Sequence, residues 1–320
     1  MICFIVAATA TCAFGQSQES DFRALLKDQK RVEAEALARD RLAKNDKDDV
    51  ALWFLARVVS DDAKKRDAAI TLAERCVASL PQSARCHSAL GTLYASAALS
   101  GGMSAIFTYA SRIKEEFVKA VELDPKFFDA RNDLLQFYLQ APGIAGGSVR
   151  KAIANAEEMG KIDANRGAVL RAQVHIYEKE YEKAEALLIR IQPGADAQLA
   201  DALTNAWASI GFSLINEKEP ARAQKLFERL VASDMNSAFA HFGLGRAQFE
   251  NKLVDAAIAS FERALQLNDK LRAHYRLGIA YQTKGDKTKA LAAFQQFISY
   301  QANGTAADDA RSRIEVLKRG

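Results

Sequence analysis

Small and apolar residues recur three or four positions apart along most of this chain, the spacing that places them on one face of a helix. Ala69, Ala73 and Cys76 form one such face, and Ala310 and Ile314 belong to another near the end of the chain. No segment shows the alternation of apolar and polar residues that indicates a β-strand. The pattern therefore predicts an all-α protein.

A longer period is superimposed on this helical one between residues 204 and 304, where three similar copies follow one another. Each copy has a bulky ring residue, then an apolar residue followed by glycine, then an alanine and, four positions later, a phenylalanine. The members are Trp207, His241 and His274; Ile210-Gly211, Leu244-Gly245 and Leu277-Gly278; Ala223/Phe227, Ala257/Phe261 and Ala290/Phe294. A period near 34 residues predicts an array of helix–turn–helix units.

These residues resemble the consensus of the tetratricopeptide repeat family, with its aromatic residue fourth, Leu-Gly seventh and eighth, Ala twentieth and Phe twenty-fourth. The resemblance implies a right-handed superhelix, or α-solenoid, that serves as a protein-binding scaffold. A closer resemblance, to exported bacterial tetratricopeptide repeat proteins of uncharacterised role, rests on residues 138–148, YLQAPGIAGGS.

Aligned on the three copies, residues 16–320 divide into about eight repeats and a capping helix, which we expect to form a single continuous solenoid. The predicted bounds are 17–49, 50–83, 84–127, 128–164, 165–203, 204–237, 238–270 and 271–304, with the cap at 305–320. Repeats three and four exceed the pattern by about ten residues after Tyr94 and about five after Tyr138. We call the segments 95–112 and 139–148 the insertions.

The composition supports a continuous helical core, because 49% of the residues are hydrophobic. The 44 Lys and Arg residues against 40 Asp and Glu residues leave a net charge of +4. These charges are interleaved without a basic block, so we do not expect nucleic acid as a partner. The five prolines are predicted to lie in turns or at helix starts.

Residues 1–15, MICFIVAATATCAFG, predict a secretory signal peptide that is cleaved before Gln16. The run from Ile2 to Phe14 carries no charge, and it is too short to span a bilayer. A lipid-modified Cys12 is disfavoured, because the residues before it lack the expected apolar one. We therefore expect an exported protein, with the periplasm as its destination.

Export would leave two cysteines, Cys76 and Cys86, on either side of the turn at Pro81. Adjacent ends of antiparallel helices can bring Cα atoms within the ~4.4–6.8 Å that a disulfide requires, and an oxidising compartment would permit the bond. The alternative is that Cys76 only replaces the small alanine that this repeat position prefers.

The sequence offers little for catalysis or metal binding. His87, His241 and His274 occupy the ring position that tryptophan takes in other repeats, and we interpret them as core substitutions, whereas His175 is isolated. The glycine-rich segment 143–148 lacks the lysine and the preceding strand of a phosphate-binding loop, so Ser148 is predicted simply to cap a helix. We predict no enzyme, no catalytic, cofactor-binding or metal-binding residue, and no cofactor.

The resemblance implies that the first helix of each repeat lines a concave groove. Carried over by position to the last three repeats, it gives Phe212, Ile215, Phe242, Arg246, Phe249, Arg272, Tyr275, Arg276 and Ile279. Aromatic residues and arginine dominate many binding surfaces. The family's five-residue carboxylate clamp is matched only by Arg272 and Arg276; Ala208, Phe212 and Gly243 stand at the other three positions. Alternatively, some of these aromatics pack between repeats.

The insertions provide a second candidate surface. Both fall between the two helices of neighbouring repeats, so they should emerge on the same edge of the solenoid. The surface would consist of Met103, Ile106, Phe107, Tyr109, Pro142 and Ile144. If this surface is exposed, it would contact a protein or a membrane. If the two insertions pack against each other, they would only fill space, and we favour this second alternative.

We therefore predict a non-enzymatic exported scaffold that binds a protein or peptide segment in its groove. The alternative is a structural subunit of a cell-envelope assembly, held by its convex face or by the insertions. An enzyme is the less favoured hypothesis, as is contact with a membrane surface.

Overall fold

The computed structural model describes residues 19–26, 30–269, 273–301 and 304–319. These residues form helices and, within the same ranges, no β-strand, which confirms the predicted all-α solenoid class. The predicted signal peptide, residues 1–15, lies outside them. The chain divides into two compact units, Met1–Gln192 and Pro193–Gly320, which we describe separately. The single continuous solenoid stays a prediction.

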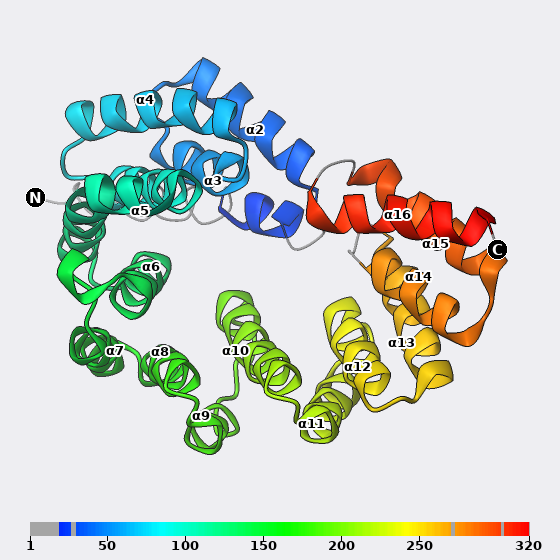
Figure 1. Cartoon of the computed structure of the whole chain (residues 1–320). Helices are drawn as coiled ribbons and strands as arrows, with labels where there is room; N and C mark the ends of the chain where they lie inside the picture. Colours follow the sequence, from blue (N-terminus) through cyan, green and yellow to red (C-terminus); the bar gives the residue numbers. More distant parts are fainter. Residues whose placement is uncertain (1–18, 27–29, 270–272, 302–303, 320) are drawn as a thin grey trace, which may run out of the picture. The chain divides into compact units, whose positions relative to one another are not determined.

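Unit 1 is a succession of helices joined by short turns, so that consecutive helices pack side by side (Figure 1). After the helical residues 19–26 come α2 (Arg31–Lys44), α3 (Asp49–Val59), α4 (Ala63–Ser79), α5 (Ala84–Leu123), α6 (Phe128–Gln140), the short 3₁₀ helix η1 (Gly143–Ala145), α7 (Val149–Ile162), α8 (Ala164–Tyr177) and α9 (Tyr181–Leu188). The first helices of repeats two to five are α3, the first half of α5, α6 and α8.

Unit 2 contains the three repeats with the clearest sequence pattern and the terminal helix. Its helices are α10 (Ala197–Asn216), α11 (Pro220–Ser233), α12 (Ala238–Glu250), α13 (Val254–Leu267), α14 (Ala273–Lys284), α15 (Lys287–Tyr300) and α16 (Thr305–Arg319). Helix α10 begins at Ala197, ahead of the predicted repeat start at 204. Helix α16 buries Ala310 and Ile314 against the preceding pair, as a cap requires.

Polar side chains at the helix starts explain why the turns are so short. Asp48, Ser83, Ser148 and Asp196 each accept a hydrogen bond from a backbone N–H in the first turn of the helix that follows. Ser148 is thus the cap that the sequence predicted. Pro220 occupies the first turn of α11, where its missing N–H has no partner to lose. The five prolines all lie in turns or at this helix start, as predicted.

Four repeats share one packing contact, in which a glycine of the first helix lies against a buried phenylalanine ring of the second. A Cβ atom built on the glycine would lie far closer to the ring than the 3.0 Å that real Cβ atoms respect. The four pairs are Gly91–Phe117 (2.6 Å), Gly211–Phe227 (2.5 Å), Gly245–Phe261 (2.7 Å) and Gly278–Phe294 (2.7 Å). The recurring glycine and phenylalanine of the sequence are therefore the two sides of one contact.

The first insertion does not form a loop. It lengthens both helices of repeat three, so that α5 consists of two helical halves joined at Gly102, whose φ of 72° is in the region that favours glycine. The halves lie against each other, since Tyr94 stacks on Tyr109 with ring centroids 5.3 Å apart. By length and composition α5 could cross a membrane; here it contributes Ile113 and Phe117 to the core of unit 1.

Cys76 at the end of α4 and Cys86 at the start of α5 are joined in a disulfide, with Cα atoms 5.6 Å apart. The turn around Pro81 brings the two helix ends together, as the spacing of the cysteines suggested. Both side chains are buried.

The glycine–phenylalanine contact predicts an overpacking penalty. Gly91→Val places two methyl groups where Phe117 already lies, and should lower the free energy of unfolding by about 1–3 kcal/mol. Gly143→Val is the matched control in the same unit, because no atom lies within 4 Å of a Cβ built there; it should change stability by less than about 0.5 kcal/mol. Urea unfolding measures both. Equal midpoints for the two variants would contradict the steric account.

Candidate functional site

The predicted groove residues lie on the first helices of unit 2, α10, α12 and α14. Most of them are half-buried, the state expected of side chains that line a groove: Phe212, Phe242, Arg246, Phe249, Tyr275, Arg276 and Ile279. Ile215 is only 7% exposed and belongs to the core. Arg272 lies outside the described residues.

The aromatic members of this set also pack between repeats. The Phe212 ring lies 5.3 Å from Phe227, 5.5 Å from Phe239 and 6.2 Å from Phe242, measured between centroids. Phe242 continues the contact to Phe261 at 5.9 Å. These ring contacts hold neighbouring helices together.

Tyr275 connects α14 to the terminal helix. Its ring lies 5.3 Å from Phe297, and its hydroxyl donates a hydrogen bond of 2.7 Å to Asp309 of α16. Burial, together with that carboxylate, raises the pKa of Tyr275, so the phenol stays protonated. Arg313 binds the same Asp309 at 2.6 Å. The contact fixes the end of the groove.

Arg246 of α12 and Arg276 of α14 are the distinctive polar groups of this surface. The Arg246 guanidinium lies 5.1 Å from the Phe212 ring centroid, and that of Arg276 lies 5.9 Å from the Tyr275 ring. In the described part of the chain neither guanidinium has a carboxylate within salt-bridge distance, although the charge of Glu250 acts on Arg246 from farther away. Burial and the positive charge of Arg276 lower the pKa of Arg246. Two guanidiniums that repel each other favour an anionic ligand, since a carboxylate would bind both.

Unit 1 differs, because arginines of its first helices are paired with carboxylates. The ion pairs are Arg57–Asp133 (2.7 Å), Arg23–Asp129 (2.7 Å) and Arg85–Glu19 (2.9 Å). Arg57 also lies 4.7 Å from the ring of Trp53, the bulky residue of repeat two. Helical residues 19–26 take part in two of these pairs and so pack on the same surface. Because these arginines are paired with carboxylates, this surface of unit 1 offers a partner little net charge.

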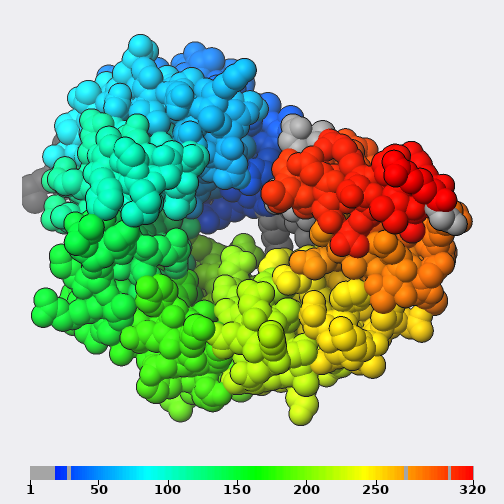
Figure 2. All heavy atoms as spheres, viewed as in Figure 1, coloured from blue at the N-terminus to red at the C-terminus, as the bar shows by residue number. Residues whose placement is uncertain are grey.

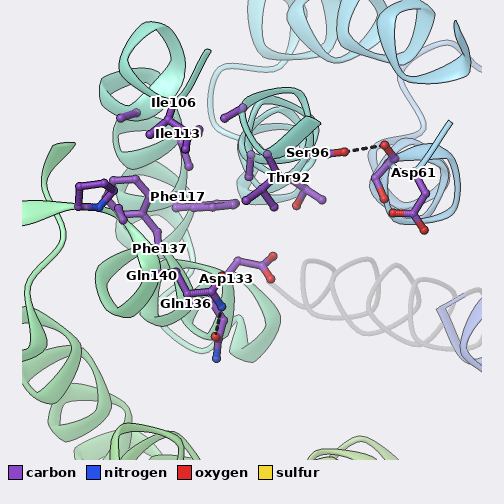
Figure 3. A pocket seen from close by; sticks show the side chains of 17 residues that line it. Asp61, Thr92, Ser96, Ile106, Ile113, Phe117, Asp133, Gln136, Phe137 and Gln140 are labelled. Atoms are coloured by element: carbon purple, nitrogen blue, oxygen red, sulfur yellow. Dashed lines mark hydrogen bonds between the residues drawn. The ribbon is translucent and has the colours of Figure 1, made fainter. Parts of the chain in front are cut away.

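Between α5 and α6, unit 1 contains a cavity of about 340 Å³. Figure 3 shows side chains from the two halves of α5 and from α6 pointing toward it. Its apolar wall includes Ile113, Phe117 and Phe137, and its polar residues include Asp133 and Gln136. A volume of this size falls at the lower end of the range for ligand pockets, ~300–1,000 Å³.

Sequence reasoning missed this cavity. The positional rule that selected the groove residues of unit 2 also selects Thr92, Asp133 and Gln136 when it is applied to the repeats starting at 84 and 128. The sequence therefore contained a signal for these three residues. It contained none for the depth of the cavity, because that depth depends on how the two halves of α5 fold back at Gly102.

The insertion residues divide into two groups. Ile106 and Tyr109 pack against the core of unit 1, and Pro142 lines the cavity. By contrast, the other three of the six predicted residues are exposed: Met103 (61%), Phe107 (51%) and Ile144 (85%). The insertions therefore fill space and also present an apolar surface. Figure 2 shows the α5 segment, cyan to green, reaching the molecular surface beside α4 and α6.

The histidines at the ring position have structural roles. His87 is 7% exposed; its Nδ1 lies 2.6 Å from Glu116 and its Nε2 lies 3.1 Å from the Pro81 carbonyl. Burial lowers the pKa of His87, but these two acceptors outweigh it and raise the pKa above its ordinary value. His241 binds the carbonyl of Met235 at 3.1 Å. Burial lowers the pKa of His274.

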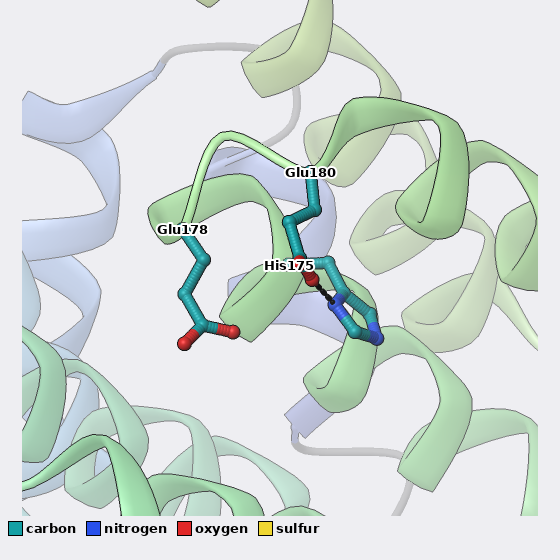
Figure 4. Close-up of side chains that lie close together, drawn as sticks. All are labelled: His175, Glu178 and Glu180. Carbon is teal, nitrogen blue, oxygen red and sulfur yellow. Dashed lines mark hydrogen bonds and ion pairs between the residues drawn. The ribbon is translucent and has the colours of Figure 1, made fainter.

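The interpretation of His175 as isolated is wrong. Its Nδ1 lies 2.7 Å from Glu180, and Glu178 lies close by (Figure 4). The three come together because the chain turns tightly at Lys179, where φ is 62°. Glu180 also binds Lys183 at 2.6 Å, so its carboxylate is already shared by two side chains.

Comparison with known proteins identifies the last two repeats. Two family models described as tetratricopeptide repeat match residues 240–270 and 272–303. The mouse protein "Superkiller complex protein 3" is 34% identical over 128 residues, which cover 35% of this chain and 8% of that protein. The chain thus spans a small fraction of this relative's length.

Solved structures of other proteins also align with this chain. Yeast Tom70 aligns with a TM-score of 0.63 and 14% identity, over 91% of this chain and 59% of that one. A chain of the APC/C hetero-tetramer Cut9–Hcn1 aligns with a TM-score of 0.48 and 16% identity, over 92% of this chain and 54% of that one. At such identities the likeness to Tom70 shows the fold alone.

Asp133 predicts a pH dependence of stability. Burial raises its pKa from 3.8 to about 6, against the lowering effect of Arg57. The folded chain then holds this proton more tightly than the unfolded chain does, so this group's contribution to stability falls as the pH rises from about 4 to about 6. Two pKa units correspond to roughly 3 kcal/mol.

The measurement is urea unfolding of the wild type and of Asp133→Asn between pH 4 and pH 7. The variant should gain stability relative to the wild type as the pH rises. Asp67→Asn is the control for removing a carboxylate at the surface, because the Asp67 side chain is 76% exposed. A pH-independent difference between Asp133→Asn and the wild type would contradict the raised pKa.

Proposed function

We propose that this chain, whose residues 240–270 and 272–303 match models of the tetratricopeptide repeat, is a non-enzymatic scaffold that binds a protein or peptide segment along the first helices of unit 2. We further propose that it is exported to the periplasm. The repeats and the 49% hydrophobic composition support the scaffold, and the uncharged segment at residues 2–14 supports export.

The observation that carries the proposal is the pair of guanidiniums at Arg246 and Arg276. Each lies near an aromatic ring on a first helix, and neither has a carboxylate partner among the residues that the structure describes. An acidic segment of a partner would place a carboxylate between them. Its apolar neighbours would contact the half-buried Phe242, Phe249 and Ile279, which pack against the core of unit 2 from the groove side.

The second candidate is a structural subunit of a cell-envelope assembly. The exposed Met103, Phe107 and Ile144 favour it, because uncovered large apolar side chains often mark an interface. In that case the insertions or the convex face would carry the interaction. Binding would then depend on apolar contact and respond little to salt.

The groove proposal predicts charge-dependent binding. A fluorescein-labelled peptide of alternating Asp and Phe should bind the full chain, and the same peptide with Asn in place of Asp should bind at least about tenfold more weakly, since a charge-assisted hydrogen bond contributes ~1.5–3 kcal/mol. Arg246→Gln together with Arg276→Gln should remove this preference. Fluorescence anisotropy at low and high salt measures it.

Arg263→Gln is the matched control, because Arg263 is an exposed arginine on the second helix α13. It should leave the preference for Asp unchanged. Equal affinity for the Asp and Asn peptides, or an equal loss in the control, would overturn the proposed site and leave the apolar assembly surface as the better account.

Export predicts a defined mature protein. Material recovered from the periplasm should begin at Gln16 and contain no free thiol at Cys76 or Cys86, because an oxidising compartment preserves a disulfide. Intact-mass measurement with and without reduction, after alkylation, tests both statements. A full-length chain recovered from the cytoplasm with all four of its cysteines alkylated, Cys3 and Cys12 included, would reject export.

A further inference from the structure

The two insertions meet at the cavity of unit 1. Leu99 and Ile106 come from the lengthened halves of α5, and Ala141 and Pro142 come from the segment that follows α6. This segment is held rigidly, because the Gly147 N–H donates to the Pro142 carbonyl at 3.1 Å. Residues of both insertions therefore contribute to the wall of the cavity, beside residues of the regular repeat pattern such as Phe117 and Phe137.

The cavity is suited to an uncharged group. No lysine, arginine or histidine lines it. Its two carboxylates are already bound, Asp133 by Arg57 at 2.7 Å and Asp61 by Arg31 at 3.2 Å. The Thr92 hydroxyl donates to the Ser88 carbonyl, and the Ser96 hydroxyl donates to the Ser60 carbonyl. An ionic ligand would find no free counter-charge, whereas an apolar group would replace water at little cost.

A row of side-chain amides lies at the edge of the cavity. The Gln140 amide donates to Gln136 at 2.8 Å, and the Gln136 amide donates to Gln173 of α8 at 2.7 Å. Gln140 and Gln136 both line the cavity. A carboxamide has two N–H donors and two acceptor lone pairs, so this row retains hydrogen-bonding capacity. That capacity matches the amide groups on either side of a peptide side chain.

We propose that the cavity is a binding site for an aromatic or branched aliphatic group presented next to an amide, with the insertions as its walls. The group can come from a peptide side chain or from a free small molecule. The glutamine row favours the peptide. The site is separate from the arginine groove of unit 2 and needs no acidic ligand.

The test uses the full chain and NMR of isoleucine methyl groups, which reports on Ile106 and Ile113 in the cavity wall. The probes are N-acetyl-phenylalaninamide, N-acetyl-leucinamide, N-acetylglycinamide and toluene. The first two should shift both methyl resonances saturably, and the glycine derivative should not. No saturable shift with any apolar probe would overturn the proposal.

Two variants locate the binding. Ala95→Phe fills the cavity and should abolish the shifts, whereas Thr108→Phe adds the same ring at an exposed position outside the lining and should preserve them. Circular dichroism checks that each variant folds. Shifts that persist in Ala95→Phe would overturn the proposal. If Ala95→Phe does not fold, Gln140→Leu is the variant that tests the proposal.

Gln140→Leu distinguishes the sources. It should weaken N-acetyl-phenylalaninamide at least about fivefold and leave toluene unchanged, because only the amide probe uses the glutamine row. If toluene and N-acetyl-phenylalaninamide bind with equal affinity, and Gln140→Leu changes neither affinity, the cavity is an apolar site for a free small molecule. A loss of both probes would show that the residue acts through the fold and would overturn its assigned role.

Discussion

The contact between a glycine and a buried phenylalanine ring sets the distance between the two helices of a repeat. Without a side chain on the glycine, the ring can lie directly on the backbone of the first helix. Phe227 shows the further consequence, because Gly211 lies on one side of its ring and Gly243, from the next repeat, on the other. The same ring therefore fixes the spacing within a repeat and between repeats.

Close packing on the second-helix side leaves the first helices with one free face, and the two units use it differently. In unit 1 the guanidiniums of Arg23 and Arg57 are neutralised by carboxylates, and the binding that we propose there takes place in the cavity and involves an uncharged group. In unit 2 Arg246 and Arg276 lack a carboxylate within salt-bridge distance among the described residues, and the recognition that we propose there depends on charge. One repeat geometry thus supports two chemically distinct surfaces.

The helices, their caps and the glycine–phenylalanine spacing could be predicted from the sequence, because each depends on residues in one repeat. The residues proposed to line the groove of unit 2 were assigned from their positions within the same repeats. The cavity could not be predicted, since its depth depends on how the two halves of α5 fold back at Gly102. The proximity of His175 to its two glutamates was missed because it depends on the positive φ of Lys179.

The most direct test of this account is a double-mutant cycle on Gly211 and Phe227. Gly211→Ala should destabilise the wild type, because the new methyl group meets the ring. With Phe227→Leu in the background, the smaller side chain can give way, and the same change should cost less. We predict a coupling free energy of about 1 kcal/mol or more in urea unfolding. Effects that add within about 0.3 kcal/mol would contradict the claim that this contact sets the helix spacing.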